Sequence, residues 1–368
     1  MSPTMRHYQI HDFLHISVST ALPGPLLDQF DFQFDYFEVE RGAETPSIEV
    51  YPFDTFETRP GETVHYDTSG RYGTYWYDTD RKLAVVRTDD GFTVYTASGV
   101  NLYPLLQSQL LHQECVFVHA AGYVDSDGGA TLLPGAGGVG KTALLGQLVT
   151  SHDVQVLGDD IVCLDVAGDC FSFPRSFVFK AYHRDVYPAV FEKYDMDTKR
   201  VRERIATVVL RSLIDNAPFV GLTKSLLHRF GYYEQTSFAL SKIRGGDYLA
   251  TVPADEIYGP ESIATSGTLD RVVFLRRVDD TEFKLAPLSH DELRNRLFSI
   301  ILREWQSELP ILCELGSLGM LELSAYFDEL ATVMARGIAD TPCHEFLVPE
   351  DASPDTLHEQ FVAAVNVR

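Results

Sequence analysis

The feature that most constrains this chain is a glycine-rich stretch at residues 131–142, which reads TLLPGAGGVGKT. Its first three residues have the apolar character of a buried strand, residues 135–142 spell G-x-x-x-x-G-K-T, and the ALLGQLV that follows has helical spacing. This order of strand, loop and helix is the setting in which a phosphate-binding loop works. The sequence therefore predicts a nucleotide phosphate site here, with a chance match in an ordinary loop as the alternative.

The positions of this loop have separate predicted roles. Its four glycines are expected to let the backbone turn with positive φ and to bring N–H groups close to an anion, and the following helix adds the partial positive charge of its first turn. Lys141 is expected to reach the β- and γ-phosphates, and the Thr142 hydroxyl to ligate Mg²⁺. The residues expected to hold the nucleotide are Gly135, Ala136, Gly137, Gly138, Val139, Gly140, Lys141 and Thr142.

Charge and hydropathy exclude several classes of protein. The chain of 368 residues has 53 acidic and 30 basic side chains, a formal net charge of −23, which repels the phosphates of a nucleic acid. No apolar run reaches the ~18 residues of a membrane-spanning helix, and the N-terminus lacks the pattern of a signal peptide. The five cysteines include no C-x-x-C pair, so no zinc site or disulfide framework is indicated. We expect a cytoplasmic protein that binds neither nucleic acid nor membrane.

The apolar pattern changes near residue 95. Residues 1–95 contain short alternating segments separated by turn signals, which predicts a β-rich N-terminal domain of unknown role; FDFQFDYFEVE at 30–40 is interpreted as one of its strands. Residues 96–368 alternate between strand and helix patterns, which predicts an α/β domain with a helical C-terminal part. The predicted helices begin after Asn101 or Pro104 and after Ser353 or Pro354, and span 141–150, 199–216, 289–305 (with Ser289 as N-cap) and 320–338.

Two further features flank the loop. His119 ends an apolar run sixteen residues before the first glycine of the motif, and the pair Asp159 and Asp160 begins eighteen residues after the lysine. Phosphoryl transfer needs an aligned acceptor hydroxyl and neutralised charge; one carboxylate can take the hydroxyl proton and another can hold Mg²⁺. Neighbouring residues on a strand face opposite sides. Asp159 and Asp160 can therefore serve these two roles only if the strand ends or twists at Gly158. The alternatives are a carboxylate that only caps a turn and a histidine satisfied within the core.

With VHAAGYV before the loop and VLGDDIVCLD after it, the chain resembles the HPr kinase/phosphorylase superfamily, which shares its nucleotide fold with the ATP-dependent phosphoenolpyruvate carboxykinases. The resemblance is compact over residues 95–170, looser beyond them, and absent from residues 1–95. It implies an α/β P-loop kinase domain of HPr-kinase/carboxykinase type with ATP and Mg²⁺ as cofactors. The implied acceptor is a hydroxyl, typically a serine, of a protein, peptide or small molecule. By resemblance Asp159 matches the catalytic base, Asp160 the metal-side carboxylate, and His119 a histidine near the phosphates.

The resemblance also has departures and open alternatives. The family's E-x-R-G metal segment corresponds here to Glu256 and the three residues after it, with a tyrosine in place of the arginine. Whether phosphorolysis also occurs therefore stays open. Arg175 and Lys180 could reach an anion or form a solvated pair, and Arg276 and Arg277 are expected to be structural. The alternative function is a nucleotide-dependent switch or assembly protein that binds ATP or hydrolyses it slowly. Whether the chain forms a homo-oligomer, like the hexameric regulatory enzymes, stays open.

Overall fold

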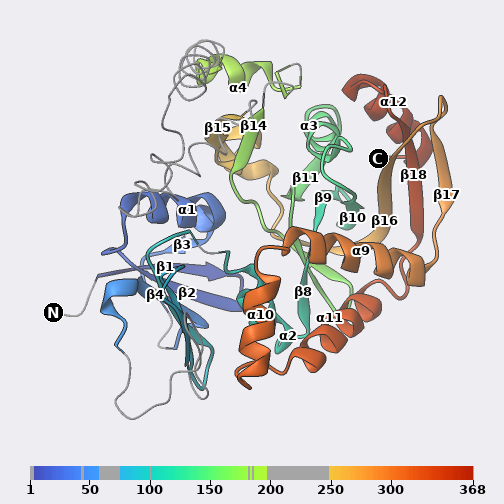
Figure 1. Cartoon of the computed structure of the whole chain (residues 1–368). Helices are drawn as coiled ribbons and strands as arrows, with labels where there is room; N and C mark the ends of the chain where they lie inside the picture. Colours follow the sequence, from blue (N-terminus) through green and yellow to red (C-terminus); the bar gives the residue numbers. More distant parts are fainter. Residues whose placement is uncertain are drawn as a thin grey trace, which may run out of the picture. The chain divides into compact units, whose positions relative to one another are not determined.

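The computed structural model describes residues 4–42, 45–57, 75–99, 101–180, 183–184, 186–196 and 248–367. The chain divides into two compact units, Met1–Arg175 with Pro253–Arg368, and Ser176–Val252 (Figure 1). In the second unit the described elements are an antiparallel strand pair and a short helix: β14 (Phe177–Lys180), β15 (Tyr248–Val252) and α4 (Pro188–Lys193). The helix predicted over 199–216 lies outside the described residues.

The N-terminal part of the first unit is organised around a seven-stranded mixed sheet. Its strands are β1 (Met5–Ile10), β2 (Leu14–Ser19), β3 (Glu38–Val39), β4 (Ile48–Pro52), β5 (Tyr75–Asp78), β6 (Leu83–Arg87) and β7 (Phe92–Thr96). Their order is β3-β1-β2-β4-β7-β6-β5. The pairs β2–β4 and β4–β7 are parallel, and the other pairs are antiparallel.

The strand predicted at residues 30–40 is wrong except at Glu38–Val39, because residues 30–34 belong to helix α1 (Gly24–Phe34) and a helical turn follows. Leu26, Phe30 and Phe34 recur every four residues and are all buried, so they form one apolar stripe of a helix. The alternation of Phe and polar residues within 30–36 concealed this longer period. A helical turn η1 (Asp35–Phe37) then leads into β3.

A second sheet, of nine strands, carries the glycine-rich loop. Its strands are β8 (Cys115–Val118), β9 (Ala120–Asp125), β10 (Gly129–Pro134), β11 (Val154–Gly158), β12 (Val162–Asp165), β13 (Asp169–Phe171), β16 (Ser266–Val278), β17 (Lys284–Pro287) and β18 (Cys343–Pro349). The order is β11-β9-β10-β16-β13-β12-β8, with β18 pairing β16 and β17. The long β16 runs parallel to β10 and β18 and antiparallel to β13. The fold is therefore mixed α/β with mixed sheets.

Helices cover both faces of the second sheet. The helices described in this part of the chain are α2 (Tyr103–Leu111), α3 (Lys141–Ser151), α8 (Ala254–Tyr258), α9 (His290–Glu304), α10 (Leu309–Ser317), α11 (Leu323–Gly337) and α12 (Pro354–Val365). Leu132 belongs to one buried cluster with α2, α9 and α11, whereas its neighbour Leu133 belongs to another with α3 and α12. Successive side chains of β10 thus face opposite layers. None of the helices in the described part combines the length and the apolar character needed to cross a bilayer.

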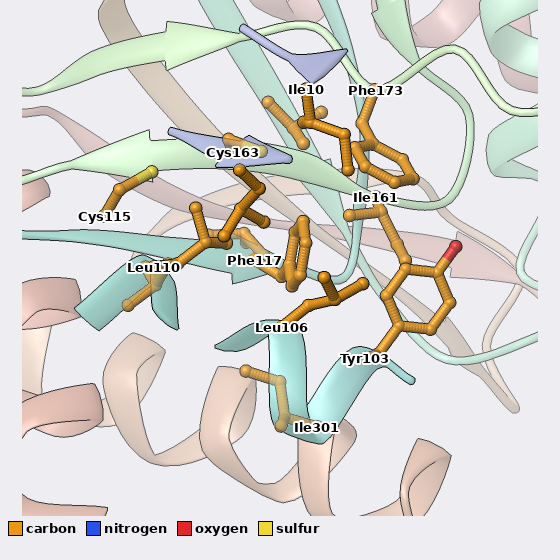
Figure 2. Close-up of a cluster of buried hydrophobic side chains, with 14 of the residues drawn as sticks. Ile10, Tyr103, Leu106, Leu110, Cys115, Phe117, Ile161, Cys163, Phe173 and Ile301 are labelled. Atoms are coloured by element: carbon orange, nitrogen blue, oxygen red, sulfur yellow. The ribbon is translucent and has the colours of Figure 1, made fainter. Parts of the chain in front are cut away.

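The larger buried cluster joins the two sheets. Figure 2 shows Ile10 of β1 in one cluster with Leu106 of α2, Phe117 of β8 and Phe173. The predicted division near residue 95 therefore marks the change from one sheet to the other and not a boundary between compact units. The physical reason is that buried side chains of β1, β2 and α1 share one hydrophobic cluster with α2 and β8.

Most helix starts lie where the sequence predicted them. Ser289 caps α9, its Oγ accepting a hydrogen bond from Glu292 N at 3.3 Å, and Ser353 caps α12 by accepting one from Thr356 N at 3.1 Å. These caps satisfy backbone donors that a first turn leaves free. Helix α10 was not predicted, because its run LPILCELGS is only nine residues long and mostly apolar.

Candidate functional site

The glycine-rich loop connects the carboxyl end of β10 to α3. Gly138 and Gly140 have φ values of 83° and 110°, but Gly135 and Gly137 are not in the positive-φ region, so the expectation for all four glycines is wrong for these two. Gly135 is required by a close approach instead, since a Cβ there would lie 2.6 Å from the carbonyl oxygen of Leu275 in β16. Cβ atoms at Gly137 and Gly138 would meet open space. The outer rim of the loop is therefore accessible to a ligand.

Lys141, the first residue of α3, is folded beneath this loop. Its Nζ donates hydrogen bonds to the carbonyl oxygens of Gly135 at 2.7 Å and Ala136 at 3.3 Å, and the residue is only 7% exposed. Burial lowers the pKa of the ammonium, while the nearby carboxylates of Asp160 and Asp159 act in the opposite direction. Neutral carbonyl oxygens hold the ammonium at the N-terminus of α3. A helix N-terminus favours anions, so a bound anion would compete with these carbonyls for the ammonium.

The acidic pair lies where β11 ends. A Cβ at Gly158 would lie 2.2 Å from the carbonyl oxygen of Ile161, so the sharp bend after the strand requires glycine. Beyond this bend the two carboxylates point to different neighbours. Asp159 Oδ2 accepts a hydrogen bond from Thr142 Oγ1 at 2.8 Å, beneath the loop, and Asp160 pairs with Arg175 on the other side.

Asp159 is the electrostatically strained member of the pair. Its Oδ1 is buried and has no hydrogen-bond partner among the described residues. Burial and the charge of Asp160 raise its pKa to about 7, although the hydrogen bond from Thr142 and the charge of Lys141 act against this shift. A buried carboxylate oxygen without a partner, next to a threonine hydroxyl, fits the oxygen ligands that Mg²⁺ prefers.

The sheet register brings His119 to Asp160. Strands β8 and β12 are antiparallel with Val118 opposite Val162, so the residue after β8 lies next to the residues just before β12. His119 Nε2 is 3.4 Å from Asp160 Oδ1. Burial lowers the pKa of His119, despite the opposing charge of Asp160, so the imidazole is neutral at pH 7.

Asp160 keeps its negative charge in this setting. Burial alone would raise its pKa, but Arg175, His119 and Lys141 together lower it below the usual value. The guanidinium of Arg175 stays protonated, because Asp160 and Tyr103 raise its pKa more than burial lowers it. The Asp160 side chain is 30% exposed, so an ionised carboxylate remains accessible from solvent.

A half-enclosed cavity of about 120 Å³ opens onto Asp160. Its polar side includes His119, Asp160 and Arg175, together with Asn101 and a second carboxylate, Glu304. Tyr103 and Trp305 are among the residues of its apolar side. Asp159 does not line it. The space suits a small molecule or a single side chain more than a nucleotide, which the open rim of the loop could accommodate.

The remaining predicted residues lie at different places. Glu256 is exposed in α8, and the described residues contain no group of three or more His, Cys, Asp or Glu side chains arranged to hold a metal ion; the metal-binding roles of Glu256 and Asp160 therefore stay predictions. The side chain of Lys180 lies outside the described set. Arg277 donates to the carbonyl oxygens of Pro349 at 2.7 Å and Glu350 at 2.6 Å, as expected of a structural residue.

Several residues of this site were not found from the sequence. Tyr103, Ile301 and Trp305 line the cavity from α2, α9 and the residue that follows α9, and Phe32 of α1 lies against Arg175. Each reads as an ordinary core aromatic or aliphatic residue, and only the fold brings them to the acidic pair. No sequence motif marks them.

No family model matches this sequence, and no curated protein is significantly similar to it. The likeness to the HPr kinase superfamily therefore stays a prediction from residues. The loop, the acidic pair and His119, on which it rests, are adjacent in space.

Proposed function

We propose that this protein is an ATP-dependent phosphotransferase that moves the γ-phosphoryl group to a hydroxyl, with Mg²⁺ as cofactor. The acceptor would be a small molecule or a single side chain, such as a serine, that enters the cavity beside Asp160. One observation carries the proposal: Thr142 Oγ1 contacts Asp159 beneath the loop, while the adjacent Asp160 faces the cavity. A phosphate site and an acceptor site would then meet at neighbouring residues.

On the phosphate side, the loop amides and the first turn of α3 would bind the nucleotide's terminal phosphates. When a nucleotide binds, the Lys141 ammonium would leave the carbonyl oxygens of the loop and contact phosphate oxygens instead. Thr142 and Asp159 are the residues that fit the metal, because they offer a hydroxyl oxygen and a carboxylate oxygen, Oδ1, that has no partner in the part of the chain that the structure describes. Bound Mg²⁺ would supply neutralisation of the charge on the phosphates.

On the acceptor side, Asp160 would accept the hydroxyl proton. In this reaction the bond from the γ-phosphorus to the ADP oxygen breaks, a bond to the acceptor oxygen forms, and the proton of the acceptor moves to the carboxylate. His119, as a neutral imidazole, would donate from Nε2 and orient Asp160. The low pKa of Asp160 makes it a weak base, but such transition states are loose and depend mainly on positioning.

We therefore propose a division of roles opposite to the one that the resemblance implies. Asp159 would act on the metal side, because its carboxylate touches Thr142 and does not line the cavity. Asp160 would act on the acceptor side, because it lines the cavity with His119. Neither assignment changes the reaction class.

The decisive experiment supplies γ-labelled ATP and Mg²⁺ with a small-molecule fraction and a protein fraction of a native extract. A labelled acceptor is expected, and ADP release should depend on adding the fraction that contains it. ADP release that is independent of any acceptor would instead support the nucleotide-dependent switch.

Variants then connect the activity to this site. Asp160→Asn should still bind Mg-ATP but lose about 10²–10⁴-fold in transfer rate. Asp153→Asn, an exposed carboxylate in the turn after α3, is the matched control and should behave as wild type. Transfer by Asp160→Asn at the wild-type rate would remove the proposed base.

A further inference from the structure

Helix α1 of the N-terminal region reaches the candidate site at Arg175. The guanidinium carbon of Arg175 lies 5.4 Å from the centre of the Phe32 ring, within the range of a cation–π contact. The same guanidinium pairs with Asp160. One aromatic ring and one carboxylate, from segments far apart in the sequence, thus contact the same cation.

The backbone that carries Arg175 is also held by the N-terminal region. His11 Nε2 donates to the carbonyl oxygen of Ser172 at 2.7 Å, where burial lowers the pKa of the imidazole and keeps it neutral. The ring of Phe173 lies 5.3 Å from that of Phe37. The Phe173 amide in turn donates to Leu157 in β11 at 2.7 Å. Residues 172–175 are therefore fixed between the N-terminal region and the strand that leads into the acidic pair.

The Arg175 guanidinium pairs with Asp160 and lies beside Tyr103, and the Phe32 ring adds a further restraint on its side chain. This side chain is 23% exposed, and a long arginine side chain loses considerable rotamer freedom when it is held in one position. The face of a planar guanidinium stacks on an aromatic ring, while its edge remains free to donate to a carboxylate. Phe32 can therefore restrict Arg175 without competing for Asp160.

We propose that Phe32 is a positioning residue: it holds the Arg175 guanidinium against Asp160, so that this carboxylate stays directed into the cavity. The N-terminal region is then a part of the catalytic site and not a separable cover. The catalytic consequence rests on the proposed phosphotransferase function, whereas the geometric claim does not.

The geometric claim is tested by the Arg175 Nε–H signal in NMR spectra of the full chain, assigned from its loss in Arg175→Lys. In the wild type this signal should be shifted by the ring current of Phe32 and exchange slowly with water. Phe32→Leu should remove the shift and speed the exchange, and Phe32→Tyr should preserve both. Phe13→Leu is the control. The Phe13 ring packs against the ring of Phe171 in β13, with 4.8 Å between the ring centres. An unchanged signal in Phe32→Leu would overturn the proposal.

The catalytic consequence is tested by steady-state kinetics of the same variants. Phe32→Leu should lower kcat by roughly three- to thirtyfold and leave KM for ATP unchanged, while Phe32→Tyr should restore kcat. An altered Arg175 signal with unchanged kcat would reject the positioning role and leave the phosphotransferase proposal standing. If the wild type transfers no phosphoryl group, that proposed function fails, and the NMR result alone decides whether Phe32 holds Arg175.

Discussion

Thr142 Oγ1 donates a hydrogen bond to Asp159 Oδ2 across 2.8 Å, joining the first turn of α3 to the bend after β11. The neighbouring Asp160 makes its contacts with Arg175 and His119 instead. Two adjacent carboxylates are therefore separated by the direction of their side chains. Removing the Asp159 carboxylate should therefore have a different effect from removing the Asp160 carboxylate.

The two amide variants should differ in their response to Mg²⁺. Asp159→Asn loses a charged oxygen beside Thr142, so the Mg²⁺ concentration for half-maximal activity should rise about tenfold or more. Asp160→Asn should need nearly the wild-type Mg²⁺ concentration but turn over more slowly. Magnesium titrations at saturating ATP measure both quantities. The reverse pattern would restore the division of roles implied by the family resemblance.

Asp159 should also make stability depend on pH. Its pKa rises from 3.8 to about 7 on folding, because of burial and the charge of Asp160. Between these values the folded protein binds more protons than the unfolded chain, so this contribution to stability is complete below pH 4 and is lost as the pH rises through 7. Asp159→Asn should therefore raise the free energy of unfolding at pH 8 by ~1–3 kcal/mol, with a much smaller gain at pH 5.

Urea unfolding without nucleotide or Mg²⁺, at both pH values, measures this difference. Asp153→Asn should give the same small change at both. A gain for Asp159→Asn that is equal at pH 5 and pH 8 would show that the carboxyl is not strained by burial.

Lys141→Met should separate nucleotide binding from folding. The ammonium is buried against two carbonyl oxygens of the loop, and methionine fills similar space without the cost of a buried charge. Nucleotide affinity should fall about tenfold or more, because the phosphates lose their charge partner, while the free energy of unfolding should be unchanged or higher. Calorimetric titration with ATP measures the affinity. Lys284→Met, at an exposed site in β17, should retain wild-type binding.

The local elements around the loop could be predicted because their signals are short in range. The strand before the loop, the helix after it and the serine caps of α9 and α12 each depend on neighbouring residues. The bend at Gly158 could be anticipated for the same reason, since two adjacent acids can face different sides only if the strand ends there.

The opposite side of the cavity could not be predicted, because it depends on tertiary contacts. Trp305 directly follows an amphipathic helix, and Phe32 lies in a helix whose pattern resembles a strand. Neither sequence context indicates a site. Arg175 could be nominated from its motif, but its pairing with Asp160 follows from the path of the chain after β13. Sequence spacing likewise could not show which of the two acids faces Thr142.

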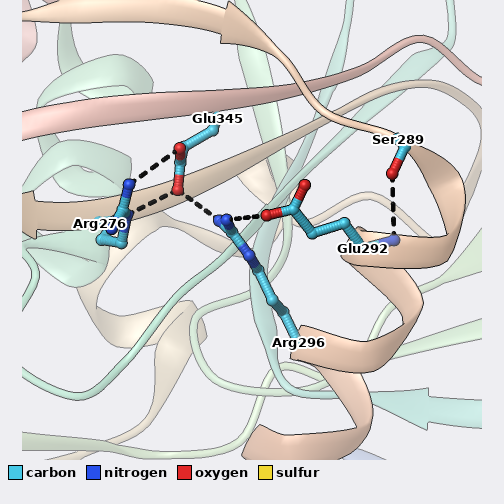
Figure 3. A network of polar contacts seen from close by, with 5 residues as sticks. All are labelled: Arg276, Ser289, Glu292, Arg296 and Glu345. Atoms are coloured by element: carbon cyan, nitrogen blue, oxygen red, sulfur yellow. Dashed lines mark hydrogen bonds and ion pairs between the residues drawn. The ribbon is translucent and has the colours of Figure 1, made fainter.

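A carboxylate of β18 anchors the middle of α9 to the sheet. Glu345 of β18 accepts hydrogen bonds from Arg276 of β16 at 2.6 and 3.1 Å and from Arg296 of α9 (Figure 3). Arg296 also binds Glu292 and lies over the ring of Phe274, 5.0 Å from its centre. Because α9 carries residues that line the cavity, this network fixes the position of one cavity wall.

Glu345→Gln should lower the free energy of unfolding at pH 7 by ~1–3 kcal/mol, because both guanidiniums lose a charged and largely buried acceptor. Burial would raise the pKa of Glu345, but the hydrogen bonds and charges of Arg276 and Arg296 lower it below the usual 4.5. Its contribution is therefore present above that value and is lost as the pH falls through the lower, folded-state pKa, so the two proteins should converge in acid. Glu292→Gln, at an exposed position, is the control and should cost less than about 0.5 kcal/mol. Urea unfolding at pH 7 and at pH 3.5 tests this; an equal cost for both variants would mean that burial of Glu345 adds nothing to the network.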